Sequence, residues 1–171
     1  MFKIGDKIID KNGKIFEIES ISEKDFGGGA SKYFILKPVF AYDFNQGYRC
    51  FVPIDKADSI LRPVMNKDEA LELIDSLSSL ESYPEVNPRE RKVYFQTVIS
   101  SGSRKDICRV IKTLTKYKEA RKKNNKPLSD FDHRLLTNLL SLFNDEVSLA
   151  LGIPIESVNG FIRDRTGASG F

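Results

Sequence analysis

A chain of 171 residues can form one domain or two small ones, and it can bury roughly 70% of the surface that it exposes when unfolded. With 40% hydrophobic residues, 30% charged residues and a net charge of +3, the composition is that of an ordinary soluble globular protein and excludes a disordered chain. No apolar run approaches the ~18 residues of a membrane span, and the start MFKIGDKIID lacks the apolar core of a signal peptide, so we expect a cytoplasmic protein with no membrane partner.

Residues 1–64 are predicted to form short β-strands. The stretch KIIDKNGKIFEI places two β-rich runs around Asn12-Gly13, a residue pair that tolerates the positive φ angles of a type I′ hairpin turn. Further strands are predicted at KYFILKPVF, after the flexible glycine-rich connection 27–31, and at YRCFVPI, which Pro53 should end because proline donates no backbone hydrogen bond. Four or five short strands joined by turns predict a small, strongly bent antiparallel β-barrel.

The pattern changes to helical spacing after residue 64. Asn66 is a suitable N-cap, Asp68 and Glu69 occupy the first turn, and apolar residues follow at helical intervals, which predicts a helix that bridges the two halves. The stretch ESYPEVNP, residues 81–88, contains two prolines and predicts a linker or sharp corner. We therefore assign residues 65–86 to a linker helix and corner.

Residues 87–171 are predicted to form an all-α helical bundle domain. Helices are expected over 88–100, after the N-cap Ser103, and from Ser129 to a stop near Gly152, each with an apolar stripe on one side. A short helix over 155–162 completes the bundle, and the final stretch RDRTGASGF is expected to fray. The predicted fold class is α+β, a small antiparallel β-barrel followed by this bundle.

Positive charge is concentrated in one block of the second half. Residues 1–80 carry a net charge of −2, whereas residues 81–171 carry a net charge of +5. Within the second half, residues 89–126 contain 13 Lys and Arg against 3 Asp and Glu. Such a block is the electrostatic footprint that nucleic-acid binding produces.

Five of these cations lie in the first turns of predicted helices, where the positive end of the helix dipole disfavours them. A bound phosphate would remove the conflict, because the backbone N–H groups, the dipole and the side chains would then face one anion. Helical periodicity places Arg89 and Lys92 on one face but points Arg91 elsewhere. The alternative is simple solvation, which we expect for the cations 121–123 at a helix C-terminus. The candidate DNA-binding residues are Arg89, Arg91, Lys92, Arg104 and Lys105.

Patterns typical of an enzyme are absent from the sequence. The single histidine, His133, is expected at the surface of a charged first turn, whereas Cys50 and Cys108 have no metal-binding spacing and are expected to be buried apolar residues. The glycine cluster lacks the Gly-Lys-Ser/Thr ending of a phosphate-binding loop. We therefore expect no catalytic residue, no metal and no cofactor.

Short motifs follow one another along nearly the whole chain. The first half contains FKIGDKII, the hairpin glycine Gly13, YFIL at 33–36, and VPIDKAD and LRPV within 52–64. The second half contains SSG at 100–102, VIKTL at 110–114, PLSDFDHRLL at 127–136 and DEVSLALGIP at 145–154. In order and spacing these motifs resemble the CarD/CdnL family of bacterial transcription regulators, whose first domain also resembles the RNA-polymerase-interacting module of the transcription-repair coupling factor.

The resemblance implies a Tudor-like barrel that grips the β subunit of RNA polymerase, and a helical domain that contacts promoter DNA at the upstream edge of the melted region. Members of this family stabilise the open complex and do not read a sequence. The implied protein is a cytoplasmic transcription regulator without enzymatic activity, and we expect a monomer. Both halves suit this role, since a short strand edge can pair with a partner's sheet and cations can hold phosphates.

The sequence departs from the family pattern at two places. Family members usually place a tryptophan before the first basic helix as a minor-groove wedge, but this chain has no Trp, and Tyr83 is either a smaller wedge or a core residue. The polymerase-facing arginine of the family falls on Phe51, and Arg49, two residues earlier on the same strand face, is a candidate substitute. Lys24 matches another basic contact position. The expected polymerase-binding residues are thus Lys24, Arg49 and Phe51.

Two other functions stay open. The stretch LALGIPIESVNGFI has the rhythm of a helix-turn-helix repressor, with Gly152 in the turn and residues 155–163 as the recognition helix, although this segment carries one cation, Arg163. A basic RNA-binding or ribosome-associated module would instead stack bases on Tyr33, Phe34 and Tyr48, whose alternation with aliphatic residues also suits a core.

Overall fold

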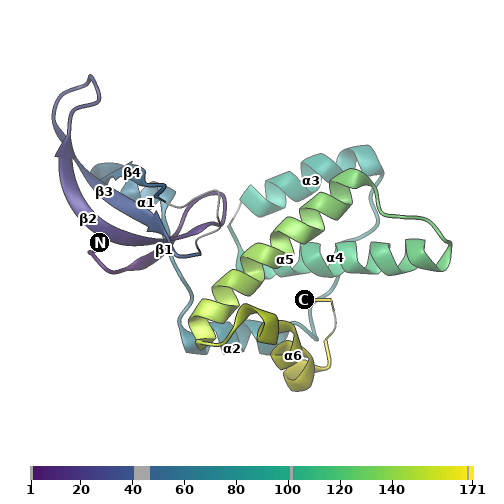
Figure 1. Cartoon of the computed structure of the whole chain (residues 1–171). Coiled ribbons are helices and arrows are strands. Elements are labelled where there is room, and N and C mark those ends of the chain that lie inside the picture. The colour runs from purple at the N-terminus through teal and green to yellow at the C-terminus, as the bar shows by residue number, and fades with distance from the viewer. Residues whose placement is uncertain (1, 41–46, 101, 169) are drawn as a thin grey trace. The chain divides into compact units, whose positions relative to one another are not determined.

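The computed structural model describes residues 2–40, 47–100, 102–168 and 170–171. The chain divides into two compact units, Met1–Val64 and Met65–Phe171, which we call the sheet unit and the helical unit (Figure 1). The first unit contains an antiparallel sheet and the second contains packed helices. The α+β class predicted from the sequence is therefore confirmed.

The sheet unit has a five-stranded antiparallel sheet in its described residues, with the strand order β4-β3-β2-β1-β5. Its core is formed by the inward-facing apolar residues of the strands and by two residues of the segment that follows β4. The strands are β1 (Lys7–Ile9), β2 (Ile15–Lys24), β3 (Ser31–Pro38), β4 (Cys50–Pro53) and β5 (Arg62–Pro63). The core residues are Ile8, Phe16, Ile18, Phe34, Leu36, Ala57 and Leu61.

This sheet is open, so the predicted barrel closure is wrong. Strands β4 and β5 are its two edges, and no ladder joins them in the part of the chain that the structure describes. The chain between them forms a 3-10 turn, η2 (Ile54–Lys56), and the short helix α1 (Ala57–Ile60), from which Ala57 enters the core. Strand β5 has two residues, and Pro63 has no backbone N–H with which to extend the ladder.

The hairpin predicted around Asn12-Gly13 is confirmed, but its turn differs from the predicted one. Strands β1 and β2 pair from Lys7↔Glu17 to Ile9↔Ile15, which leaves residues 10–14 in the loop. Gly13 has a φ angle of 82°, whereas Asn12 does not have the positive φ angle that a type I′ turn requires. The Asp10 carboxylate instead accepts the backbone N–H groups of Asn12 and Lys14, both at 2.9 Å.

Most of the helix boundaries that were predicted for the helical unit are confirmed. Ser103 accepts the N–H of Asp106 at 3.3 Å and caps α4, and Ser129 accepts the N–H of Asp132 at 3.1 Å and caps α5. Gly152 ends α5 with a φ angle of 66°, as expected for a glycine after a helix. The helices are α2 (Lys67–Ser76), α3 (Pro88–Ser100), α4 (Arg104–Lys123), α5 (Asp130–Leu151) and α6 (Ile155–Thr166).

Helix α2, which we expected to bridge the halves, belongs to the core of the helical unit. It begins at the predicted cap, where the Asn66 side chain accepts the N–H of Glu69 and the Glu69 side chain accepts the N–H of Asn66. Its inner face packs with the apolar residues of α4, α5 and α6. That inner face consists of Ala70, Leu73, Ile74 and Leu77.

The end of the chain is also part of this core. Helix α6 continues to Thr166, past the predicted end at residue 162. The side chain of Phe171 is 6% exposed, and its ring centroid lies 5.6 Å from that of Phe143 in α5. The predicted fraying of the last residues is therefore wrong for the residues described there, because the apolar Phe171 gains burial against the bundle.

Candidate protein and nucleic-acid interfaces

Arg91, a candidate DNA-binding residue, points into the helical unit. Its Nη2 donates to the Oδ2 of Asp132 at 2.6 Å, and the guanidinium carbon lies 4.8 Å from the ring centroid of Tyr117. The side chains of Arg91 and Asp132 are 13% and 2% exposed. An acid of α5 thus balances this first-turn cation, so that a bound phosphate is not required to explain it.

Arg104 is also balanced within the chain. Its Nε and Nη2 donate to the Oε1 of Glu146 at 2.9 and 2.7 Å, and the same oxygen accepts the backbone N–H of Met65 at 3.1 Å. Glu146 is buried, so this ion pair ties the start of the helical unit to α4 and α5. The hypothesis that phosphate neutralises the first-turn cations is therefore unnecessary for Arg104.

The other three candidates, Arg89, Lys92 and Lys105, are exposed. The Nζ of Lys92 lies 5.5 Å from the ring centroid of Phe131, and neither Arg89 nor Lys105 forms an ion pair within the described residues. Helices α3 and α4 pack together and run in opposite directions, so their N-termini lie at opposite ends of the pair (Figure 1). A helix of 13 residues separates them by about 20 Å. The structure therefore brings Arg89 and Lys92 together but leaves Lys105 apart.

Tyr83 is a core residue and is not placed as a wedge. Its hydroxyl donates to the Oδ1 of Asp106 at 2.8 Å, its backbone N–H donates to Thr113 at 2.9 Å, and the guanidinium of Arg109 lies 4.0 Å from its ring centroid. Burial and the hydrogen bond to Asp106 raise the pKa of Tyr83 to about 12. The same hydrogen bond is the main reason why the pKa of Asp106 is lowered.

The sheet unit carries an exposed group of aromatic rings next to the edge strand β4. Phe26 and Phe51 are 65% and 43% exposed, and the ring of Phe26 lies edge-on to Tyr33 and Phe51 with centroid distances of 5.2 and 5.7 Å. We call Phe26, Tyr33 and Phe51 the aromatic patch. Sequence analysis selected Phe51 for this surface but missed Phe26.

A structured loop holds Phe26 over the sheet. The Asp25 carboxylate accepts the N–H groups of Gly27 at 2.8 Å and Gly29 at 3.2 Å, and both glycines have positive φ angles. The glycine-rich connection, which we expected to be flexible, therefore has a defined turn. An aromatic residue between an Asp and a run of glycines was the available sequence signal for this exposed ring.

Arg49 and Lys24 occupy different surroundings in the same unit. Arg49 makes a bidentate ion pair with Glu19, with Nη2 at 2.8 Å from Oε1, and this hydrogen bonding lowers the pKa of Glu19. The register of β2 against β3 shifts at Glu19, which marks a bulge there. Lys24 is exposed at the end of β2, paired with Ser31. Arg49 thus presents a charge that an intrachain acid already balances.

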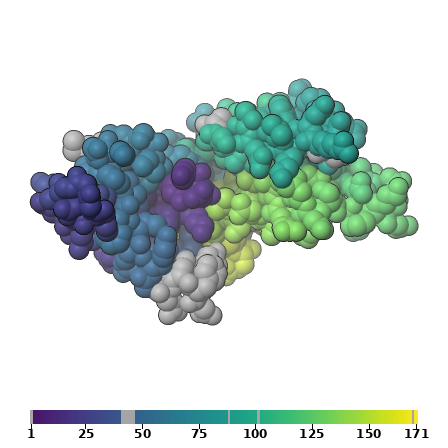
Figure 2. Space-filling model, turned by 90° about the horizontal axis from the view of Figure 1, so that it is seen from above, coloured from purple at the N-terminus to yellow at the C-terminus, as the bar shows by residue number. Residues whose placement is uncertain are grey.

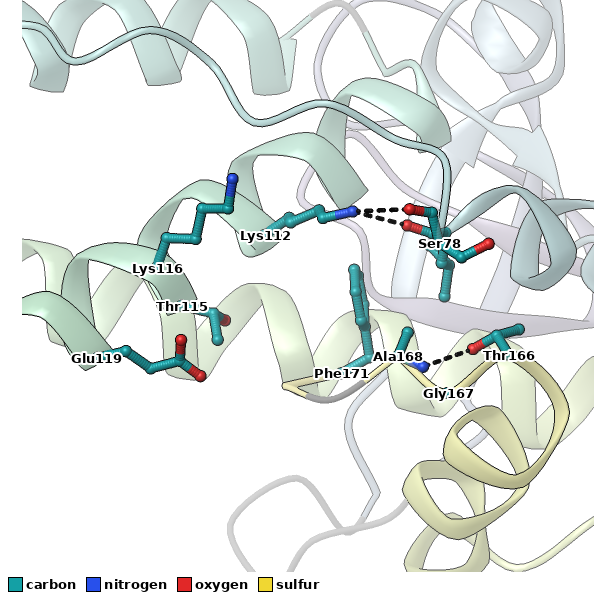
Figure 3. Close-up of a pocket in the computed structure, with 10 residues that line it drawn as sticks. Ser78, Lys112, Thr115, Lys116, Glu119, Thr166, Gly167, Ala168 and Phe171 are labelled. Atoms are coloured by element: carbon teal, nitrogen blue, oxygen red, sulfur yellow. Dashed lines mark hydrogen bonds between the residues drawn. The ribbon is translucent and has the colours of Figure 1, made fainter.

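A pocket of about 300 Å³ lies between α4, the end of α2 and the residues that follow α6 (Figure 3). Lys112 points toward the end of α2, where its Nζ donates to the carbonyl oxygens of Leu77 and Ser78 at 3.1 and 3.2 Å. Lys116 donates to the hydroxyl of Ser82 at 2.6 Å. Both ammonium groups are engaged by the chain itself, so we assign no ligand to this pocket.

The single histidine and the two cysteines, which sequence analysis considered for catalysis or metal binding, lie in different environments. His133 is exposed, as expected. Cys108 is buried, and its burial raises the pKa of the thiol to about 12. Cys50 is only half-buried. The prediction that both cysteines are buried is therefore confirmed for Cys108 and wrong for Cys50. Among the described residues, no group of three or more potential metal ligands lies together, and no helix is long and apolar enough to cross a membrane.

Side-chain positions give limited support to the two alternative functions, an RNA-binding module and a helix-turn-helix repressor. Phe34 is 2% exposed and cannot stack on a base, although Tyr48 is 55% exposed. In the proposed recognition helix, Arg163 is exposed but lies 3.8 Å from Asp164. Arg165, further along α6, is paired with Asp75 of α2. The surface of α6 is therefore poor in unbalanced positive charge.

Comparison with known proteins gives no family assignment. A scan against models of protein families finds no match, and a search of curated proteins finds no match either.

Proposed function

We propose that this protein is a transcription regulator without enzymatic activity, in which a Tudor-like sheet unit binds the β subunit of bacterial RNA polymerase. The helical unit contacts phosphates of promoter DNA without reading the sequence, and the two contacts together modulate the stability of the open complex. The order of motifs that resembles the CarD/CdnL family supports this role. The observation that carries it is the exposure of Arg89 and Lys92 in the first turn of α3, which remains after the intrachain ion pairs of Arg91 and Arg104 are assigned.

Exposed positive charge remains in the helical unit without two of the candidate DNA-binding residues. Arg91 and Arg104 are balanced by buried acids, but Arg89 and Lys92 remain exposed in the first turn of α3. The N–H of Arg89 donates to the side chain of Asn87 at 2.9 Å, so the backbone there is already capped and the side chains would supply the contact. Ammonium and guanidinium groups that bind phosphates act through charge and carry no sequence information.

The sheet unit supports a protein contact through the aromatic patch. Aromatic residues are enriched among the residues that contribute most to protein–protein affinity. Phe51 is exposed in β4, which has one neighbour, β3, in the described residues, and the exposed ring of Phe26 contacts that of Phe51. An edge strand offers backbone groups for pairing with a partner's sheet. Because Phe51 stands where the family has an arginine, the partner surface is expected to be apolar at this point.

The polymerase contact is tested with the full chain and purified RNA polymerase β subunit in a pull-down and a titration. We expect the wild type to be retained and the double variant Phe26→Ser/Phe51→Ser to bind about 30-fold more weakly, which corresponds to about 2 kcal/mol for the loss of two central rings. Ile4→Ser, which removes another exposed apolar side chain of the same unit, is the matched control. A folded wild-type chain that never retains the β subunit would refute this half of the proposal.

The DNA contact is tested by the dependence of affinity on salt concentration. Each phosphate contact adds about 0.9 to the magnitude of the slope of log K against log salt, so Arg89→Gln/Lys92→Gln should lower that magnitude by about 1.8. The loss should be the same for duplexes of different sequence. An unchanged slope in this double variant would show that the two side chains are merely solvated.

A further inference from the structure

Helix α4 continues well beyond the core of the helical unit. Tyr117 is its last partly buried residue, and every residue from 118 to 127 is exposed. The helix nevertheless runs to Lys123, and the segment where α4 leads toward α5 forms the tip of the helical unit, shown in green in Figures 1 and 2. A helix that is polar on all sides gains no burial, so packing against this chain does not explain the extension.

The tip has a defined structure although its side chains are exposed. Asn125 adopts a left-handed conformation with a φ angle of 53°, and the N–H of Lys126 donates to the carbonyl of Arg121 at 2.9 Å while the N–H of Asn125 donates to that of Lys122 at 3.0 Å. This pair of bonds is the Schellman motif that closes a helix C-terminus. The Nε of Arg121 also donates to the carbonyl of Pro127. The tip is therefore ordered before any partner binds.

The tip is strongly positive. It contains five cations and one acid, Glu119, and none of the cations forms an ion pair in the part of the chain that the structure describes. The helix dipole accounts for cations in the last turn, but Lys118 precedes that turn and Lys126 follows the helix. We call the cations Lys118, Arg121, Lys122, Lys123 and Lys126 the basic tip.

The first turn of α3 lies at the base of this tip. Arg91 rests over the ring of Tyr117 at 4.8 Å, one residue before Lys118, and Lys92 lies 5.5 Å from the ring of Phe131 at the start of α5. The exposed cations Arg89 and Lys92 and the basic tip are therefore at the same end of the helical unit. The fold thus gathers at one end of the helical unit exposed cations from the two ends of the basic block 89–126.

We propose that the basic tip is a second phosphate-binding element, which holds the backbone of double-stranded DNA together with Arg89 and Lys92. This inference rests on the proposed function, and it adds Lys118, Lys126 and the cations 121–123, of which sequence analysis attributed 121–123 to solvation. Lys118 and Lys122 are four residues apart and share one helix face, with a spacing of about 6 Å along the axis. The preformed cap means that little chain entropy is lost when the tip binds.

The test compares three double variants of the full chain on one 30-base-pair duplex, with affinity measured by fluorescence anisotropy at several salt concentrations. Lys118→Gln/Lys122→Gln removes two tip charges, Arg89→Gln/Lys92→Gln removes the charges of α3, and Lys11→Gln/Lys14→Gln removes two exposed lysines of the sheet unit as the control. Glutamine keeps a helix propensity close to that of lysine, so the tip should remain folded.

We expect the tip variant to lower the magnitude of the salt slope by about 1.8, and the control variant to leave it unchanged. Between 50 and 200 mM salt the wild type would then lose about 12-fold more affinity than the tip variant. If the tip variant keeps the wild-type slope while the α3 variant does not, the inference about the tip is overturned and the proposed function stands. A wild type without salt-dependent binding would overturn both, and tighter binding of a duplex RNA of equal length would overturn the assignment to DNA.

Discussion

Replacing Arg91 by methionine should destabilise the helical unit, although Arg91 belongs to the most basic block of the chain. Its partner Asp132 is 2% exposed, and the pair lies where α3, α4 and α5 meet. Methionine keeps much of the apolar stem but removes the charge. The carboxylate of Asp132 would then be buried without its cation.

The expected loss is about 3 kcal/mol in the free energy of unfolding. Removing one member of a buried ion pair typically costs about 3–5 kcal/mol, because the remaining charge stays desolvated and unpaired. The lower end applies here, since Asp132 still accepts a hydrogen bond from the hydroxyl of Ser129 at 2.8 Å. The methionine stem can also stay in contact with the ring of Tyr117.

Urea unfolding followed by far-ultraviolet circular dichroism measures this loss, because most helical residues belong to the helical unit. With a slope of about 2 kcal/mol per molar urea, the midpoint should fall by about 1.5 M. Arg89→Met is the matched control two residues away, and its exposed side chain predicts a change within about 0.5 kcal/mol. Adding Asp132→Asn to Arg91→Met should restore part of the stability, because it removes the unpaired charge.

The opposite pattern would refute this reasoning. If Arg91→Met left the midpoint unchanged and lowered the salt dependence of DNA binding, Arg91 would act as a phosphate ligand and the ion pair with Asp132 would not govern its role.

Three further predictions concern residues that sequence analysis placed differently or left unexplained. Asn125→Ala should lower stability by about 1 kcal/mol in urea unfolding, because alanine is strained in the left-handed conformation, whereas Asn125→Gly should not. Phe171→Ala should cost about 3 kcal/mol in the same assay, since its ring is buried against Phe143. Tyr83→Phe should raise the pKa of Asp106 toward its ordinary value in an NMR titration, because the Tyr83 hydroxyl is the main cause of its depression. A depressed carboxyl pKa stabilises the fold above the unfolded-state pKa and the benefit is lost as pH falls through the folded-state value, so this variant should lose less stability on acidification.

Helix boundaries could be predicted because their signals are local. Ser103 and Ser129 each cap a helix by accepting an N–H three residues later, and Gly152 ends α5, so a window of a few residues contains the whole interaction. The open sheet and the buried Phe171 depend instead on partners far away in the sequence. No local pattern reports that β5 stops after two residues, or that a ring at residue 171 meets one at residue 143.

The aromatic patch illustrates a second limit of sequence analysis. Phe51 was selected through its position in a motif, but its neighbour Phe26 lies in a glycine-rich turn that looked like a flexible connection. The contact between the two rings depends on the turn that Asp25 holds and on the pairing of β3 with both β2 and β4. The contact between the two rings depends on how three strands pair, and the sequence of any one strand does not show this.

The first turn of α3 shows how a weak sequence signal acquires its meaning from the fold. Periodicity alone separates Arg91 from Arg89 and Lys92, but it does not say which direction faces the protein. The partner that decides this, Asp132, is 41 residues away in α5. Once α5 is in place, Arg91 is held in a buried ion pair and the other two cations must face outward, beside the basic tip. A helix N-terminus can therefore hold inward and outward cations at once, and only the outward ones are available to an external polyanion.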